Sequence, residues 1–363
     1  MAYDGKVMRA ALEQFQADKQ RRSSQFLERQ RRIFRQVPEL QEIDRELRGT
    51  MSQIIASALQ RGTDPLPAIR VIRDSNLDLQ RRRAELLAKH GYPVDALEEK
   101  AYCELCNDSG YRGGGLCICL QEYYNRAQIA ELSQMLDLGT QSFDTFSFAW
   151  YSERVSPELG ISPRKLMENN FDICRDYAYE FGPRSDNLLL SGDPGLGKTF
   201  LSACIARVVS ENGFSVVYDT ASTIFSRFEA AKFRRDDDTA PDEDVARYEN
   251  CDLLILDDLG TEMTTTFVQS ALYQLINGRL MAGKKTIIST NLNPEEIGRR
   301  YSPQVRSRLE GEYRILPFFG EDIRKLKRGY APKRRRWRKK RGAFEEVFRL
   351  ADAAVTGNRM TRR

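Results

Sequence analysis

The chain has 363 residues, 41% hydrophobic and 30% charged, with a net charge of +5. This is the composition of a soluble globular protein, and the length predicts about two domains. The sequence has no apolar run near the ~20 residues that a membrane helix needs, nor the apolar segment of a secretory signal. We therefore expect a cytoplasmic protein with no membrane partner, whose thiols stay reduced.

The first hundred residues are predicted to be helical. Apolar residues recur at three- and four-residue spacing in 25–62 and again in 67–91. Pro38 and Gly49 are expected to interrupt the first stretch. Two interpretations stay open: a helical hairpin that packs on its own core, or a docking module for another protein.

A cysteine cluster follows, in the stretch CELCNDSGYRGGGLCIC. Two close pairs lie ten residues apart and supply four thiolates: Cys103, Cys106, Cys117 and Cys119. This pattern predicts a closed tetrahedral zinc site with a structural role, because four protein ligands leave no open position for water. An iron–sulfur cluster uses the same ligand set and is the alternative. The other three are expected to be ordinary buried thiols: Cys174, Cys204 and Cys251.

After a predicted helix at 120–136, short apolar runs alternate with helical stretches. The runs predict strands at 187–192, 214–221, 252–258 and 285–291. The stretches between them predict helices at 199–212, 222–233 and 267–280. This alternation is typical of an α/β fold with a parallel sheet covered by helices. The unbroken apolar strands indicate burial on both faces.

The stretch GDPGLGKT matches the phosphate-loop pattern between a predicted strand and a predicted helix. Its backbone N–H groups are expected to surround the phosphates of ATP. Lys198 is expected to reach the β- and γ-phosphates, and the Thr199 hydroxyl to bind Mg²⁺. The predicted nucleotide-binding residues of the loop are Gly192, Asp193, Pro194, Gly195, Leu196, Gly197, Lys198 and Thr199.

The stretch CDLLILDD provides two acids at the end of a predicted buried strand. Asp257 is placed to hold Mg²⁺, directly or through water. Asp258 is the candidate for orienting or deprotonating the attacking water.

With both motifs in view, the sequence resembles the AAA+ ATPases, and among them the bacterial helicase loaders of the DnaC/DnaI family, with IstB-type transposition helper ATPases as relatives. The matching stretches are GDPGLGKT, LLILDDLGTE, IISTN, RSRLEG and GEDIRKLK, within about 140–328. The cysteine-rich element after a helical segment resembles loaders of Gram-positive bacteria, and the IstB-type relatives known to us lack it. The resemblance implies that this element stiffens a domain that the helicase recognises.

The resemblance also implies roles for residues outside the two motifs. Asn291 matches the sensor-1 residue that positions water, and Arg324 matches the sensor-2 arginine. Arg308 matches the arginine finger offered to a neighbouring subunit, with Arg306 as the alternative. Many AAA+ proteins have Asp-Glu where this chain has Asp257-Asp258, and the shorter acid implies slower hydrolysis.

The resemblance implies a P-loop AAA+ ATPase that loads the replicative hexameric DNA helicase onto DNA. The expected domains are a helical, zinc-binding partner domain (1–130), the ATPase domain (140–328) and a basic tail (329–363). The expected cofactors are ATP, Mg and Zn; the expected partners are the helicase, single-stranded DNA and further copies through the ATPase domains. One alternative is an IstB-like helper acting on double-stranded target DNA with a transposase. Another is a DNA-binding adaptor switched by nucleotide with little turnover.

The charges at the C-terminal end are unevenly distributed. Residues 333–341, KRRRWRKKR, are basic except for Trp337. Such a block is expected either to contact nucleic-acid phosphates or to be a solvated tail.

Overall fold

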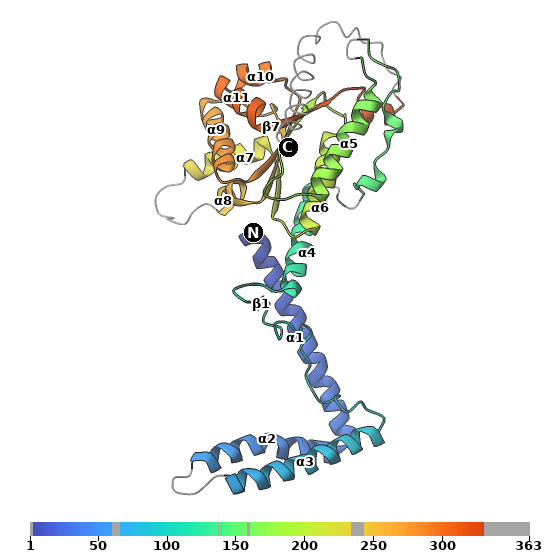
Figure 1. The fold of residues 1–363 in the computed structure, drawn as a ribbon, viewed down its shortest axis with the longest axis vertical. Helices are drawn as coiled ribbons and strands as arrows, with labels where there is room; N and C mark the ends of the chain where they lie inside the picture. The colour runs from blue at the N-terminus through green and yellow to red at the C-terminus, as the bar shows by residue number, and fades with distance from the viewer. Residues whose placement is uncertain are drawn as a thin grey trace, which may run out of the picture. The chain divides into compact units, whose positions relative to one another are not determined.

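A computed structural model describes residues 3–59, 66–136, 138, 140–157, 160–233 and 243–329 (Figure 1). The chain divides into two compact units, Met1–Leu12 with Gln121–Arg363, and Glu13–Leu120. Within the described part of the chain, no helix has both the length and the apolar character to cross a membrane. The predicted basic block at 333–341 lies outside the described residues.

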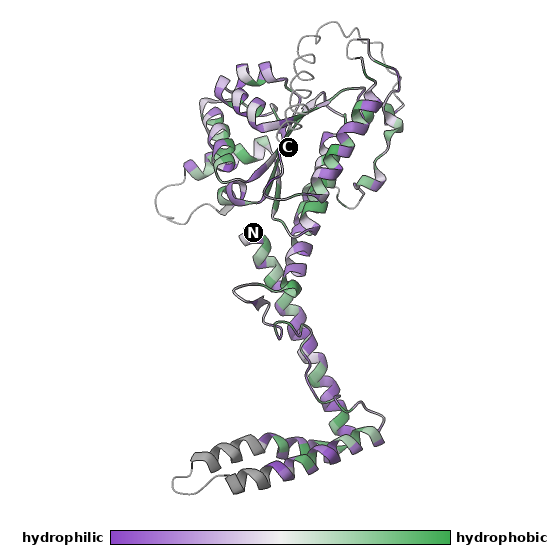
Figure 2. Ribbon diagram, viewed as in Figure 1, coloured by the Kyte–Doolittle hydropathy of each residue, from purple (hydrophilic) through white to green (hydrophobic). Residues whose placement is uncertain are grey.

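The Glu13–Leu120 unit is built mainly from helices. It contains most of α1 (Gly5–Gln36), then α2 (Pro38–Leu59) and α3 (Leu66–Lys89), which pair as a hairpin. Figure 2 shows hydrophobic and hydrophilic positions interleaved along α1 and along the coloured parts of α2 and α3. The small core of this unit consists of Ile33, Val37, Leu40, Leu87, Ala96 and Leu97.

The two predicted interruptions of the first helical stretch have different outcomes. α1 ends before Pro38, which begins α2, because proline suits the first position of a helix. The interruption predicted at Gly49 is wrong, since α2 continues through this residue. A glycine inside a helix costs only about 1 kcal/mol, which the pairing of α2 with α3 can offset.

The other unit contains a five-stranded parallel sheet, which confirms the predicted fold class. Its order is β4 (Val216–Thr220), β5 (Leu253–Leu259), β6 (Lys285–Thr290), β3 (Asn187–Gly192) and β7 (Tyr313–Phe318). All four predicted strands are present. β6 lies between β3 and β5, so the end of β6 separates the phosphate loop from the two acids.

Helices cover both faces of this sheet, because alternate strand residues point to opposite sides. Leu188 and Leu190 contribute to one core and Leu189 to the other. The first core includes residues of α5 (Pro163–Tyr179) and α6 (Lys198–Glu211). The second includes residues of α7 (Ala221–Lys232), α8 (Glu243–Asn250), α9 (Thr266–Met281), α10 (Pro294–Arg300) and α11 (Pro303–Glu312). Figure 1 shows these two groups of helices on opposite sides of the strands.

The sequence pattern missed strand β7, whose residues YRILPF include a proline. β7 pairs only with β3, at the edge of the sheet. An edge strand tolerates Pro317 because the missing N–H need not serve a second neighbour. After β7 comes the short helix α12 (Ile323–Lys327).

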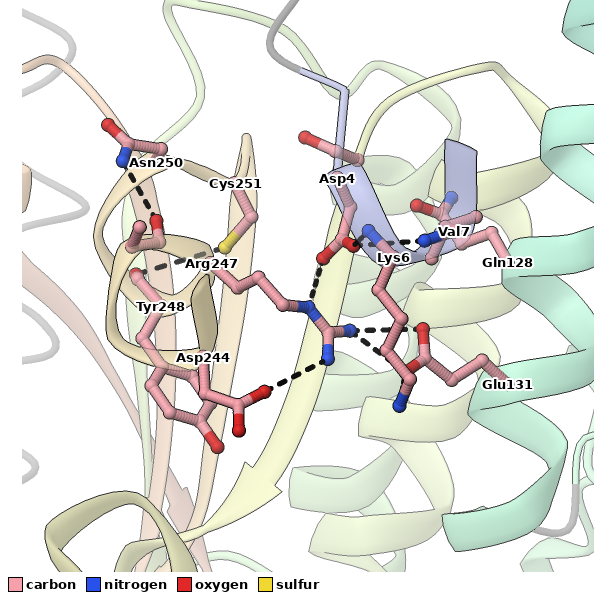
Figure 3. Close-up of polar contacts among 12 residues, drawn as sticks. Asp4, Lys6, Val7, Gln128, Glu131, Asp244, Arg247, Tyr248, Asn250 and Cys251 are labelled. Carbon is pink, nitrogen blue, oxygen red and sulfur yellow. Dashed lines mark hydrogen bonds and ion pairs between the residues drawn. The ribbon is translucent and has the colours of Figure 1, made fainter. Parts of the chain in front are cut away.

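Residues at the start of α1 belong to the same unit as the sheet. Figure 3 shows their polar contacts. The Asp4 carboxylate accepts the backbone N–H of Val7 at 3.1 Å and also pairs with Arg247 of α8. Arg247 donates to both oxygens of Glu131, each at 3.0 Å, on α4 (Ile118–Met135). The backbone N–H of Asp4 donates to the Tyr124 hydroxyl at 2.9 Å. The first turn of α1 is thereby held to α4 and α8.

Two short 3-10 helices, η1 (Phe143–Thr145) and η2 (Phe148–Trp150), precede α5.

Candidate nucleotide and metal sites

The predicted phosphate loop leaves the carboxyl end of β3 and enters α6, the context that the motif requires. Gly197 lies at the N-terminus of α6 with φ +95°. A Cβ atom there would lie 2.7 Å from the Tyr151 hydroxyl, which donates to the Leu196 carbonyl at 3.0 Å. This position therefore requires glycine, and the loop can turn its N–H groups toward an anion at the helix N-terminus.

Lys198 is almost fully buried inside the loop. Its ammonium group donates to the carbonyls of Gly192 at 2.7 Å and Asp193 at 3.0 Å. Burial lowers the pKa of Lys198, and the negative charges of Asp258 and Asp257 oppose that shift. The loop thus presents a cation beside the two acids of β5.

Asp257 lies at the centre of a hydrogen-bond network at the carboxyl edge of the sheet. Its side chain accepts from the hydroxyls of Thr199 at 3.0 Å and Tyr218 at 2.6 Å. Its second oxygen accepts from the Ser289 hydroxyl. A threonine hydroxyl beside a carboxylate is the oxygen donor set that Mg²⁺ uses in P-loop proteins, so the residues present fit the ion.

Tyr218 and Ser289 were not identified from the sequence. Tyr218 belongs to β4 and Ser289 to β6, the two neighbours of β5 in the sheet. Their proximity to Asp257 follows from the strand order of the sheet, which the sequence motifs do not reveal. Their position near the ends of predicted strands was the one signal available.

Asp258 adopts a left-handed conformation with φ +54°, directly after Asp257. Its backbone N–H donates to the Ser289 hydroxyl oxygen at 3.0 Å. Partial desolvation and the Asp257 charge raise the pKa of Asp258, whereas Lys198 and Arg324 act in the opposite direction. A carboxylate with a raised pKa is a better proton acceptor, as a base that activates water must be.

The sensor candidates Asn291 and Arg324 also lie near this edge of the sheet. Asn291 directly follows β6, and its Oδ1 atom would lie 3.3 Å from a Cβ built on Gly260. Arg324 is in α12, whose Ile323 N–H donates to the Gly195 carbonyl at 2.9 Å. The structure therefore ties the helix of Arg324 directly to the phosphate loop.

Arg308 and Arg306 lie on α11, and each pairs with a glutamate of the same helix. Arg308 is 3.9 Å from Glu312, and its side chain is 43% exposed. Arg306 donates to Glu310 at 2.6 Å and is more buried, at 31% exposed. The exposed side chain of Arg308 is the better placed to reach another subunit, and its role as a finger stays a prediction.

The four clustered cysteines converge as a metal site requires. Their sulfur atoms all lie within 4.8 Å of one another. The Cys103–Cys117 and Cys106–Cys119 sulfur pairs are 3.7 Å and 3.5 Å apart. Zinc–sulfur bonds of about 2.3 Å place the corners of a tetrahedron about 3.8 Å apart, so the cluster fits one zinc ion.

A short hairpin and one aspartate shape the loop that carries these cysteines. β1 (Tyr111–Arg112) pairs with β2 (Gly115–Leu116) between the two cysteine pairs. The Asp108 carboxylate accepts the backbone N–H groups of Cys103 at 2.9 Å and Tyr102 at 3.1 Å. The Cys117 N–H donates to the Gly110 carbonyl at 2.9 Å. The loop thus has its own hydrogen bonds that bring the thiols together.

The thiol groups differ in their affinity for protons. Burial works against the Cys106 thiolate, but the Gly110 N–H and the neighbouring thiols bring its pKa down to about 6. Burial and the same neighbours raise the pKa of Cys119. One thiolate among close thiols is a site suited to a cation. The remaining three cysteines are buried, as predicted: Cys174, Cys204 and Cys251.

Comparisons with known proteins agree with the resemblance carried by the motifs. The family model described as IstB-like ATP binding protein matches residues 174–304. The Replicative helicase loader DnaC of Escherichia coli (strain K12) is 27% identical over 237 residues, which cover 64% of this chain and 88% of the loader. An insertion sequence ATP-binding protein of Sinorhizobium fredii is 28% identical over 161 residues, covering 44% of this chain and 52% of that protein.

Among solved structures, the crystal structure of the DnaC helicase loader aligns with a TM-score of 0.42 and 20% identity, over 50% of this chain and 99% of that one. The predicted resemblance is confirmed: the chain is similar to DnaC-type AAA+ loaders and related to IstB-type ATP-binding proteins.

Proposed function

We propose that this chain, an AAA+ protein similar to DnaC-type helicase loaders, hydrolyses ATP and loads a replicative DNA helicase onto DNA. The extent of the similarity carries this proposal. The alignment with the loader covers 88% of that protein, whereas the alignment with the insertion sequence protein covers 52%. The proposed partners are the hexameric helicase and single-stranded DNA.

ATP binding is assigned to the phosphate loop of this chain. The loop N–H groups and Lys198 hold the phosphates, and Thr199 with Asp257 holds Mg²⁺. The bound ion supplies positive charge that neutralises the phosphate oxygens. Tyr218 and Ser289 orient the Asp257 carboxylate through their hydrogen bonds.

Hydrolysis is assigned to residues around the same edge of the sheet. Asp258 orients the attacking water and accepts its proton, while Asn291 holds that water in line with the γ-phosphate. Arg324 contributes positive charge near the γ-phosphate. Arg308 completes the site of a neighbouring subunit when copies of the ATPase domain assemble side by side.

The cysteine element is proposed to bind one zinc ion through Cys103, Cys106, Cys117 and Cys119. Thiolates so close together fit a single ion; a cluster of several iron and sulfide ions would spread its ligands further apart. A closed zinc site stabilises the local fold and takes no part in the reaction. In this proposal the Glu13–Leu120 unit provides the surface that binds the helicase.

Two measurements on the purified protein test the proposal. ATP turnover is measured with and without single-stranded DNA, and binding to a purified hexameric helicase is measured by co-elution. A loader should hydrolyse ATP, respond to single-stranded DNA and co-elute with the helicase. Turnover without helicase binding would contradict the loader function while leaving the ATPase assignment intact.

The match of an IstB-like family model to residues 174–304 favours a second candidate, a transposition helper ATPase. Such a protein would prefer double-stranded DNA and would bind a transposase rather than a helicase. A third candidate, a DNA-binding adaptor switched by nucleotide, would bind ATP with negligible turnover. The same turnover and co-elution measurements, with double-stranded DNA added, distinguish the three.

A further inference from the structure

The turn that follows Asp258 contains a buried glutamate that the mechanism above does not use. Glu262 is 7% exposed, although it lies in a loop between β5 and α9. One carboxylate oxygen accepts the Gly260 N–H at 3.0 Å. The other accepts from the hydroxyl of Tyr301, which is itself buried. A buried carboxylate with both oxygens occupied has a defined orientation.

This glutamate stabilises the turn that sets the direction of Asp258. Asp258 is left-handed and Gly260 has φ +106°, so the chain reverses sharply after the strand. The Thr261 hydroxyl donates to the Asp258 carbonyl at 2.9 Å. Residues in such conformations persist only where surrounding contacts hold them, and Glu262 provides one of these contacts.

The same turn is packed closely against the loop that follows β6. A Cβ on Gly260 would lie 2.8 Å from Leu292 and 3.3 Å from the Asn291 Oδ1 atom. The Thr290 hydroxyl donates to the Leu259 carbonyl at 2.7 Å. A shift of the turn would therefore move both Asp258 and the surroundings of Asn291.

Through Tyr301, the glutamate also reaches the junction between α10 and α11, the helix that carries the candidate arginine finger. Tyr301 is the C-cap of α10, and the next residue, Ser302, caps the N-terminus of α11. Arg300 adds two contacts with the turn, at 2.6 Å to the Glu262 carbonyl and 2.8 Å to the Thr264 hydroxyl. The turn and the junction of α10 with α11 are thus joined by side chains from both sides.

We propose that Glu262 is a positioning residue for ATP hydrolysis, which holds Asp258 in its productive conformation and links that conformation to the start of α11. This inference rests on the proposed ATPase function. Glu262 touches neither nucleotide nor water in this scheme; it acts through Asp258. Its loss should therefore slow turnover and leave ATP binding, which depends on the phosphate loop, nearly unchanged.

Steady-state ATP turnover of four variants of this chain tests this role. Glu262→Ala removes both hydrogen bonds and should lower kcat about tenfold or more, approaching the effect of removing a general base. The KM for ATP should stay within about twofold of wild type. Glu262→Gln can still accept from Gly260 and can donate to Tyr301, so it should recover at least about half of the wild-type kcat. Tyr301→Phe removes one hydroxyl and should give an intermediate kcat.

Tyr177→Phe is the matched control. The buried Tyr177 hydroxyl has no hydrogen-bond partner in the described part of the chain, so its removal should leave kcat unchanged. Wild-type kcat in Glu262→Ala, or a Glu262→Gln variant as slow as Glu262→Ala, would overturn the inference. If Glu262→Ala does not fold, a Tyr301→Phe rate equal to that of Tyr177→Phe overturns it.

Amide hydrogen exchange provides a readout that does not need turnover. The segment 258–261 should exchange faster in Glu262→Ala and in Tyr301→Phe than in wild type, and remain slow in Tyr177→Phe. Unchanged exchange in Tyr301→Phe would overturn the proposed link. Failure of the proposed function is distinct, because there the wild type itself would show no ATP turnover while the exchange comparison could still be made.

Discussion

The cysteine element and the nucleotide site are assembled in opposite ways. The four thiols come from 17 consecutive residues, Cys103–Cys119, and a hairpin and Asp108 bring them together locally. The nucleotide site draws on Lys198, Asp257 and Arg324, which only the complete sheet brings to one edge. A local site depends on its own loop and its ligand, whereas a distributed site depends on the whole domain. Perturbing one should leave the other largely intact.

The largest effect is expected from Lys198→Ala. Removing the cation from the phosphate loop should lower ATP turnover by a factor on the order of 10²–10³, comparable with losing one preorganised donor to a developing charge. Zinc content should remain one ion per chain, because the cysteine loop is separate. Turnover by enzyme-coupled assay and metal by elemental analysis check both expectations.

Lys165→Ala is the control for this lysine, since Lys165 is exposed and pairs only loosely with Glu168 at 3.4 Å. It should hydrolyse ATP at the wild-type rate. Wild-type turnover in Lys198→Ala would refute the assignment of the nucleotide site.

Arg308→Ala tests whether the nucleotide site includes a residue from a second chain. It should bind ATP normally and hydrolyse it at least about tenfold more slowly, a conservative expectation because an arginine finger can contribute about 10³–10⁵ in rate. Mixing it with Lys198→Ala should restore part of the activity, since each variant keeps the half-site that the other lacks. Turnover of the mixture at several ratios is the measurement.

Arg299→Ala is the matched control, because Arg299 is exposed and pairs within α10 with Glu295 at 3.8 Å. It should be neutral in both assays. A rate per chain that does not change with protein concentration, together with no recovery on mixing, would mean that hydrolysis is monomeric.

Replacing Cys103 and Cys117 with serine tests the local site. The double variant should lose its zinc and with it the local fold of the loop, since thiolate zinc binding contributes about 10–16 kcal/mol in isolated fingers. ATP turnover should stay within about twofold of wild type, because the loop and the sheet belong to different compact units. Elemental analysis and proteolysis of the loop report the change.

Cys174→Ala serves as the control, since this cysteine is buried in the core around the sheet. It should keep one zinc ion per chain. Freshly purified wild type that contains no zinc would contradict the metal assignment.

The smallest effect is expected from Asp4→Ala, which removes contacts of the first turn of α1 rather than contacts of the nucleotide site. Asp4 caps α1 and pairs with Arg247, and its side chain is 2% exposed. Its loss should destabilise the sheet-containing unit by about 2–3 kcal/mol, between the loss of a cap and the breaking of a buried pair. Denaturant unfolding measures this loss. The control is Asp172→Ala, because Asp172 is exposed and pairs with Arg175. Equal stability of the two variants would show that the first turn of α1 contributes little.

Much of the fold was predictable because the signals are local. Buried parallel strands are continuous apolar runs, so β3, β4, β5 and β6 were found. The edge strand β7 was missed, since Pro317 is a local signal against a strand and only the sheet shows that its missing N–H is harmless. The interruption predicted at Gly49 failed for the related reason that helix pairing outweighs a weak propensity.

The sequence by itself determined the sites whose residues are neighbours along the chain: the phosphate loop, the two acids of β5 and the four cysteines. Only the tertiary structure decided which side chains support them. Tyr218 and Ser289 reach Asp257 because β4 and β6 flank β5, and Tyr301 reaches Glu262 across 39 residues. Spacing along the chain encodes a turn or a loop, but the contacts between strands and helices follow from the order in which they pack, and no short stretch of sequence contains that order.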